Sequence, residues 1–207
     1  MSNVSNQKGK LSLAYFTTVA LLVSLELVLG FTPLGFVAIP PVSITTMHIP
    51  VIICSIILGP SAGAILGLTF GIISLISATT GASLSPIDLL FSPFASGHPI
   101  YSLIMCIVPR VLLGIIPAYI YKFLYSLIKN RFFTIAISSA VATICHTLLV
   151  LGCLSIFFKA LVIKQVFLTI ISLNGCIEIL VVVLIVPAVS LPVRKYVLSR
   201  NTLGTSI

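Results

Sequence analysis

Ile100–Tyr121, with the sequence IYSLIMCIVPRVLLGIIPAYIY, is the segment that decides the fold. It is apolar almost throughout, and its only charged residue is Arg110. A helix rises about 1.5 Å per residue, so a segment of about 20 apolar residues crosses the hydrocarbon core of a bilayer. The segment is therefore predicted to be a transmembrane helix that carries one arginine inside the membrane.

Further apolar segments flank this one, and together they predict an all-α integral membrane bundle of six transmembrane helices. The chain is 59% hydrophobic and only 7% charged, whereas soluble domains carry about 25% charged residues. Residues 1–207 are interpreted as one transmembrane domain, with an N-terminal tail over residues 1–10 and a basic C-terminal tail over residues 192–207. The predicted spans are Leu11–Gly30, Thr45–Leu58, Ala62–Thr80, Ile100–Tyr121, Phe132–Phe158 and Val166–Leu191.

The distribution of basic residues predicts the orientation of the bundle, because cytoplasmic loops of membrane proteins are enriched in Lys and Arg. Six spans put both termini on one side, and that side holds eight of the 11 basic residues, against two on the other. Both termini are therefore predicted to be cytoplasmic, and the proline-containing loops 32–44 and 81–99 to face outward. The eight residues are Lys8, Lys10, Lys122, Lys129, Arg131, Arg194, Lys195 and Arg200.

Several polar residues inside the predicted spans fall at similar depths, roughly 12–18 Å from the outer ends of their helices. They are Arg110, His146, Asn174 and Glu178. Ionisable groups at this depth are costly and usually functional. One interpretation is an internal Arg110–Glu178 ion pair. Another is a cavity open to the outside, in which Arg110 binds an anionic group through two hydrogen bonds. His146 fits either a packing role or a ligand contact, and Glu26 is expected to snorkel or to anchor a loop.

Small residues recur at helical spacing in two of the spans. Gly63, Gly67 and Gly71 place a glycine on every fourth position of one helix face, which predicts close packing within the bundle or against another protein. Ala20 and Ser24 form a similar but weaker pair in the first span.

Motifs of the common catalytic classes are missing from the sequence. It contains no H-E-x-x-H, G-x-S-x-G or Walker A pattern, so neither an enzyme nor an ATPase is expected. The cysteines lie in or beside apolar segments and no two are spaced as C-x-x-C, so they are interpreted as small apolar residues and no metal site is expected.

A group of short motifs carries a resemblance to a known family. They are TPLG at residues 32–35, IPPVSITTMHIP at 39–50, LGPSAGAILG at 58–67, FSPF at 91–94, VPR at 108–110, and Asn174-Gly175 with Glu178. From about Leu11 to Lys195 the chain resembles the substrate-binding S component of an energy-coupling factor (ECF) transporter, a class of bacterial vitamin importers. Residues 45–50 are most similar to the pantothenate-specific branch.

The resemblance implies that the chain captures a vitamin, most of all pantothenate, outside the cell and delivers it across a bacterial cell membrane. A coupling transmembrane protein and two ATPase subunits would be its partners and would hydrolyse ATP, so no cofactor is expected in this chain. Ala20 and Ser24 would contact the coupling protein, and Arg110 would neutralise the carboxylate of the vitamin. The other expected substrate-binding residues are His146, Asn174, Glu178, Thr45, Thr46, His48 and Ser92.

Two alternative functions stay open at this point. The chain departs from the family pattern at His146, where an asparagine between threonines is usual, so an S component for another vitamin or small metabolite is one alternative. The other is a stand-alone proton-coupled small transporter in which Glu178 and His146 form the proton relay. This second alternative predicts uptake driven by a pH gradient without any ATPase.

Overall fold

The computed structural model describes residues 2–37, 44–80, 88–158 and 173–203, and the regular secondary structure within them is helical apart from one short pair of strands. The strands are antiparallel, with Phe36 opposite Thr45. The elements are α1 (Ser2–Gly30), β1 (Phe36–Val37), β2 (Ile44–Thr45), α2 (His48–Leu58), α3 (Pro60–Thr80), the 3-10 helix η1 (Asp88–Phe91), α4 (Pro99–Ile128), α5 (Arg131–Phe158) and α7 (Leu173–Leu203).

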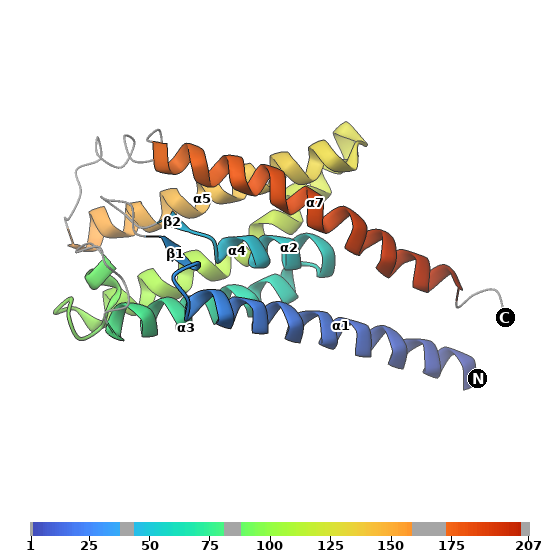
Figure 1. Cartoon of the computed structure of the whole chain (residues 1–207), viewed down its shortest axis with the longest axis horizontal. Coiled ribbons are helices and arrows are strands. Elements are labelled where there is room, and N and C mark those ends of the chain that lie inside the picture. The colour runs from blue at the N-terminus through green and yellow to red at the C-terminus, as the bar shows by residue number, and fades with distance from the viewer. Residues whose placement is uncertain (1, 38–43, 81–87, 159–172, 204–207) are drawn as a thin grey trace.

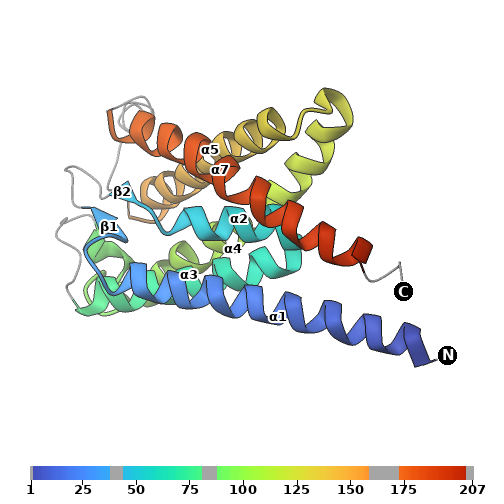
Figure 2. The same cartoon turned by 45° about the vertical axis from the view of Figure 1, so that its right-hand side comes forward.

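The helices form one bundle whose two ends differ (Figure 1). The chain termini and the turn between α4 and α5 lie toward one end, while β1, β2 and η1 lie at the other. Helix α2 runs through the middle, with α1 and α7 on opposite sides of it in both views (Figure 2). Both termini therefore leave the bundle at the same end, and the side of the membrane that this end faces stays a prediction.

Most of the helices are long and apolar enough to cross a membrane. Four meet this condition by length and composition, namely α3, α4, α5 and Gly175–Arg194 of α7. Tyr15–Gly30 and His48–Leu58 are shorter apolar helices. The helical membrane bundle is therefore confirmed, while the exact number of six spans stays a prediction.

The helix ends differ from the predicted ones in several places. Helix α1 begins at Ser2 and α7 continues to Leu203, so the expected tails are helical over most of their length. Only Lys129, in a left-handed conformation with φ 54°, and Asn130 separate α4 from α5. Lysine and arginine are good helix formers, so basic residues mark the membrane boundary without ending a helix. The predicted start of the last span, Val166, lies outside the described residues.

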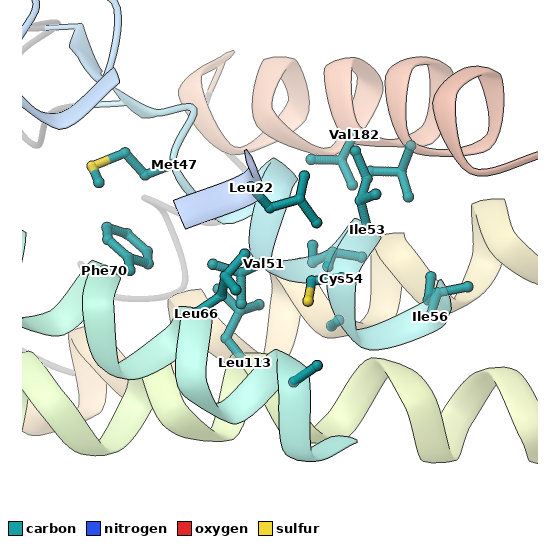
Figure 3. Close-up of a cluster of buried hydrophobic side chains, with 14 of the residues drawn as sticks. Leu22, Met47, Val51, Ile53, Cys54, Ile56, Leu66, Phe70, Leu113 and Val182 are labelled. Atoms are coloured by element: carbon teal, nitrogen blue, oxygen red, sulfur yellow. The ribbon is translucent and has the colours of Figure 1, made fainter. Parts of the chain in front are cut away.

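The apolar core is centred on α2 (Figure 3). The side chains of Val51 and Cys54 on α2 are fully buried, because neighbouring helices cover this short helix on several sides. The outer helices expose large apolar side chains such as Phe16 and Ile100, as expected for a surface in contact with lipid. The core residues labelled in Figure 3 are Leu22, Met47, Val51, Ile53, Cys54, Ile56, Leu66, Phe70, Leu113 and Val182.

Helices α3 and α4 pack so closely that their backbones touch. A Cβ atom placed on Gly63 would collide with the main chain of α4, and one on Gly67 would collide with the carbonyl oxygen of Arg110. At Gly71 the nearest atom would be the carbonyl oxygen of Cys106, at 2.8 Å. The glycine repeat therefore serves packing inside the bundle, and it sets the position of Arg110 against α3.

The two prolines inside α4 do not end the helix. Beside Pro117, the main-chain N–H of Ala118 donates a hydrogen bond of 3.1 Å to the Oγ atom of Ser55. A polar main-chain group in an apolar interior needs such a partner, and a proline within a helix disturbs the regular ladder. The contact ties α2 to α4 next to the glycine face.

Candidate functional site

Arg110 lies inside the bundle between two aromatic rings. Its side chain is buried, with 5% of its surface exposed, and its Cζ atom lies 5.3 Å from the ring centre of Phe70 and 4.9 Å from that of Phe91. Its Nη1 atom donates a hydrogen bond of 2.7 Å to the carbonyl oxygen of Met105. Aromatic faces attract a cation and attract it more strongly when water is excluded, so the rings hold the guanidinium group in place without neutralising it.

One buried histidine, His146, lies near this arginine, and a second, His48, lies near His146. His146 on α5 is within electrostatic reach of Arg110 and of His48, and its ring centre lies 6.0 Å from that of Phe70. Both histidines are almost fully buried, and within the described part of the chain the Nε2 atom of each has no hydrogen-bond partner. A buried polar atom normally has one, so these two atoms are available to a bound molecule. We name Arg110, His48, His146, Phe70 and Phe91 the Arg110 cluster.

Glu178 has a structural partner other than Arg110. Its Oε1 atom accepts a hydrogen bond of 3.0 Å from the main-chain N–H of Thr45, which ties α7 to strand β2. The Thr45 hydroxyl accepts a bond of 3.3 Å from the N–H of Met47. The ion pair and the anion-binding cavity therefore both stay predictions, with Glu178 bonded to β2 and Arg110 bonded to the main chain of α4.

Thr46 and Ser92 brace the loops beside the cluster. The Thr46 hydroxyl donates a bond of 2.6 Å to the carbonyl oxygen of Leu34. Ser92 is 2% exposed, and its hydroxyl oxygen lies 3.3 Å from the Thr79 hydroxyl and 3.4 Å from the N–H of Ala95, which donates to it. Their observed contacts are within the protein, and their expected contact with the substrate stays a prediction.

The loop that carries Phe91 is fastened to α4. The Ser102 hydroxyl donates to the carbonyl oxygen of Leu90 at 2.7 Å and is hydrogen-bonded to the Ser96 hydroxyl at 2.7 Å. The Cys106 thiol donates to the carbonyl oxygen of Phe91 at 3.4 Å. These contacts hold the Phe91 ring over the arginine.

Two members of the cluster were missed by the sequence analysis. Phe91 belongs to the FSPF motif, of which only Ser92 was expected to bind the substrate. Phe70 stands three residues after Gly67, on the part of α3 that faces α4, and this spacing was the available signal. Asn174 is in the first turn of α7, and its side chain lies outside the described residues.

Glu26 does not snorkel toward the membrane surface, so that expectation is wrong. Its side chain is 0% exposed, and neither carboxyl oxygen has a hydrogen-bond partner among the described residues. Leu22 and Gly30, four residues away on either side, are buried too. This face of α1 is therefore turned toward α2 and α3, and the carboxyl group lies near Cys54 of α2.

We expect Glu26→Met to raise the thermal unfolding midpoint of the isolated chain in detergent. An unpartnered polar group in an apolar interior costs about 1–3 kcal/mol, and methionine fills a similar volume without that cost. Ser24→Ala is the control, since Ser24 is exposed on the same helix and should leave the midpoint unchanged. A lower midpoint for Glu26→Met would mean that the carboxyl group makes a favourable contact in solution.

Ala20 and Ser24 lie on the outer surface of α1. Both are exposed, and the Ser24 hydroxyl donates a bond of 2.8 Å to the carbonyl oxygen of Ala20, which keeps it within its own helix. The pair therefore offers a flat surface of small residues to the outside of the bundle.

Comparison with known proteins places the chain in a transporter family. Residues 14–190 match the family model described as "ECF transporter, substrate-specific component". The chain is also 34% identical, over 158 residues, to the pantothenic acid transporter PanT of Lactococcus lactis subsp. cremoris (strain MG1363), and the match covers 72% of this chain and 76% of that protein. All members of the Arg110 cluster fall within the region that matches the family model. The chain belongs to the family of substrate-specific components of ECF transporters, and is thus a substrate-binding transport subunit and not an enzyme.

Proposed function

We propose that the chain binds pantothenate from outside the cell and delivers it across a bacterial cell membrane as the S component of an ECF importer. The observation that carries the proposal is the buried Arg110, held between Phe70 and Phe91 with His146 near it and His48 near His146. The likeness to the pantothenic acid transporter PanT supports the choice of vitamin.

The chemistry of pantothenate suits this cluster. The vitamin has one carboxylate, an amide, two hydroxyl groups and no aromatic ring. The Arg110 guanidinium would bind the carboxylate in a site from which water is excluded, where such a charge-assisted bond is strong. His48 and His146 would bind the hydroxyl or amide groups, and Asn174 and Glu178 would make further contacts with the vitamin.

The other subunits of the transporter would be separate proteins. A coupling transmembrane protein would contact the small-residue surface at Ala20 and Ser24, and two ATPase subunits would hydrolyse the ATP that drives transport. The termini would lie in the cytoplasm, and the end with β1, β2 and η1 would face outward, where the vitamin enters.

Calorimetry of the purified chain in detergent, without any ATPase, tests this proposal. The panel is pantothenate, riboflavin, thiamine, folate and biotin, and we expect one-to-one binding of pantothenate alone. Binding of a different vitamin would keep the family role and overturn the substrate. Binding of none of them would overturn capture by the isolated subunit, and proton-driven uptake in liposomes would then support the stand-alone transporter.

A further inference from the structure

Two tyrosines and two arginines gather at the end of the bundle opposite the Arg110 cluster. On α4, the rings of Tyr121 and Tyr125 stack with their centres 5.8 Å apart and their planes 16° apart. The Cζ atom of Arg194 on α7 lies 4.9 Å from the ring centre of Tyr121. Arg131, the first residue of α5, is within electrostatic reach of the Tyr125 hydroxyl. We name these four residues the Tyr–Arg cluster; they come from α4, α5 and α7, and three of them lie close in sequence to the turn between α4 and α5.

The cluster brings two positive charges together without a carboxylate. Each arginine is within electrostatic reach of the Tyr125 hydroxyl. The whole chain contains only three acidic residues. All of them lie toward the other end: Asp88 opens η1, Glu178 is bonded to β2, and Glu26 is in the last turns of α1 before β1. No side chain of this protein can therefore supply the counter-charge.

Buried donors in the cluster also lack partners. Tyr121 is 7% exposed, and its hydroxyl makes no hydrogen bond to any described residue. The Nη1 atom of Arg194 is likewise buried and without a described partner. Buried polar atoms are rarely left unpaired, so two donors in one place point to an acceptor that comes from outside the chain.

The surroundings of the cluster favour a lipid as the source of that acceptor. Phe123, Leu127 and Phe133 on the same helical hairpin are all more than half exposed, at 66%, 65% and 57%. Basic and aromatic residues beside exposed apolar ones are typical of the level at which lipid headgroups lie. Basic sites between helices at this level bind anionic headgroups.

We propose that the Tyr–Arg cluster binds the phosphate of an anionic phospholipid. Arg131 and Arg194 bind phosphate oxygens with their planar donor groups, and the Tyr121 hydroxyl donates a further hydrogen bond. The acyl chains lie along the exposed apolar side chains of the hairpin. Because the lipid joins α4, α5 and α7 at one end, its binding stabilises the folded bundle. The site is separate from the proposed vitamin site.

The test uses the full chain in detergent, to which phosphatidylglycerol, phosphatidylcholine or inorganic phosphate is added in turn. Native mass spectrometry counts retained lipid, and the thermal midpoint reports stabilisation. We expect phosphatidylglycerol to be retained and to raise the midpoint, and the double variant R131Q/R194Q to bind it at least about tenfold more weakly. Tyr121→Phe removes only a hydroxyl, so it should fold normally and bind phosphatidylglycerol less tightly.

Lys122→Gln is the matched control, because Lys122 is an exposed basic residue on the same helix that is not part of the cluster. It should bind phosphatidylglycerol as the unmodified chain does. Equal retention of phosphatidylcholine, equal losses in the control and the double variant, or unchanged binding in Tyr121→Phe would each overturn the proposal. Tight binding of inorganic phosphate without any preference between the lipids would overturn the lipid assignment in favour of a soluble phosphate.

Discussion

Arg110→Ala is expected to weaken pantothenate binding by about 100-fold or more. Truncating one partner of a buried, hydrogen-bonded charge pair costs about 2–5 kcal/mol, and each 1.4 kcal/mol is about a factor of ten in affinity. The upper part of this range applies because Arg110 is buried and the neighbouring rings of Phe70 and Phe91 cannot replace its charge. Calorimetric titration of the purified variant measures the effect.

A ligand that lacks the carboxylate tests the same contact with the unmodified protein, so a loss of affinity cannot result from misfolding. Pantothenol, the alcohol analogue, should bind the unmodified chain far more weakly than pantothenate does. Arg110→Ala should bind both compounds about equally, because the group that distinguishes them is gone. Arg110→Lys keeps the charge but loses the planar donor group of arginine. Its affinity for pantothenate should therefore lie between that of the unmodified chain and that of Arg110→Ala. If the unmodified chain bound pantothenol as tightly as the vitamin, Arg110 would have another role.

Much of the fold could be predicted because the bilayer imposes simple rules on sequence. The predicted last residues of the second, third and fifth helices, Leu58, Thr80 and Phe158, are also the last residues of α2, α3 and α5. The predicted start of the second helix at Thr45 is wrong, because Thr45 lies in β2 and α2 begins at His48. The tails could not be predicted, because charge marks the membrane surface and a helix can extend beyond it. The side of α1 that faces the bundle could not be predicted either. The helix is apolar on most sides, so no contrast between a polar and an apolar face indicated that Glu26 is buried.

The candidate site was predicted only in part. Counting helical depth put Arg110 and His146 at the same level, and the structure brings these two residues near each other. The same count placed Glu178 beside them; it started from Val166, which lies outside the described residues, and the observed partner of Glu178 is the main chain of β2. Loop residues such as Phe91 depend on contacts between distant segments, which no periodicity reveals.

Gly67→Ala is expected to destabilise the bundle and to reduce vitamin binding together. The added Cβ atom would meet the carbonyl oxygen and carbon of Arg110 and the Cα atom of Val111, all of which belong to the backbone of α4. Overpacking costs about 1–3 kcal/mol even where side chains can adjust, and backbone atoms cannot rotate away. The two helices must therefore separate, which moves Arg110 away from Phe70. The thermal midpoint and calorimetric affinity should both fall.

Gly152→Ala is the matched control, because it makes the same change in a transmembrane helix where a Cβ atom would meet nothing within 4 Å. Alanine is favoured over glycine inside a helix by roughly 0.5–1 kcal/mol, so this variant should be as stable as the unmodified chain or more so. Gly71→Ala should fall between the two, since its nearest contact, at 2.8 Å, is less severe. The thermal midpoint should therefore be highest for Gly152→Ala, lower for Gly71→Ala and lowest for Gly67→Ala, in the order of the space available to the added Cβ atom. A stable Gly67→Ala with full vitamin affinity would show that α3 and α4 can separate without disturbing Arg110, and that the glycine face does not position the site.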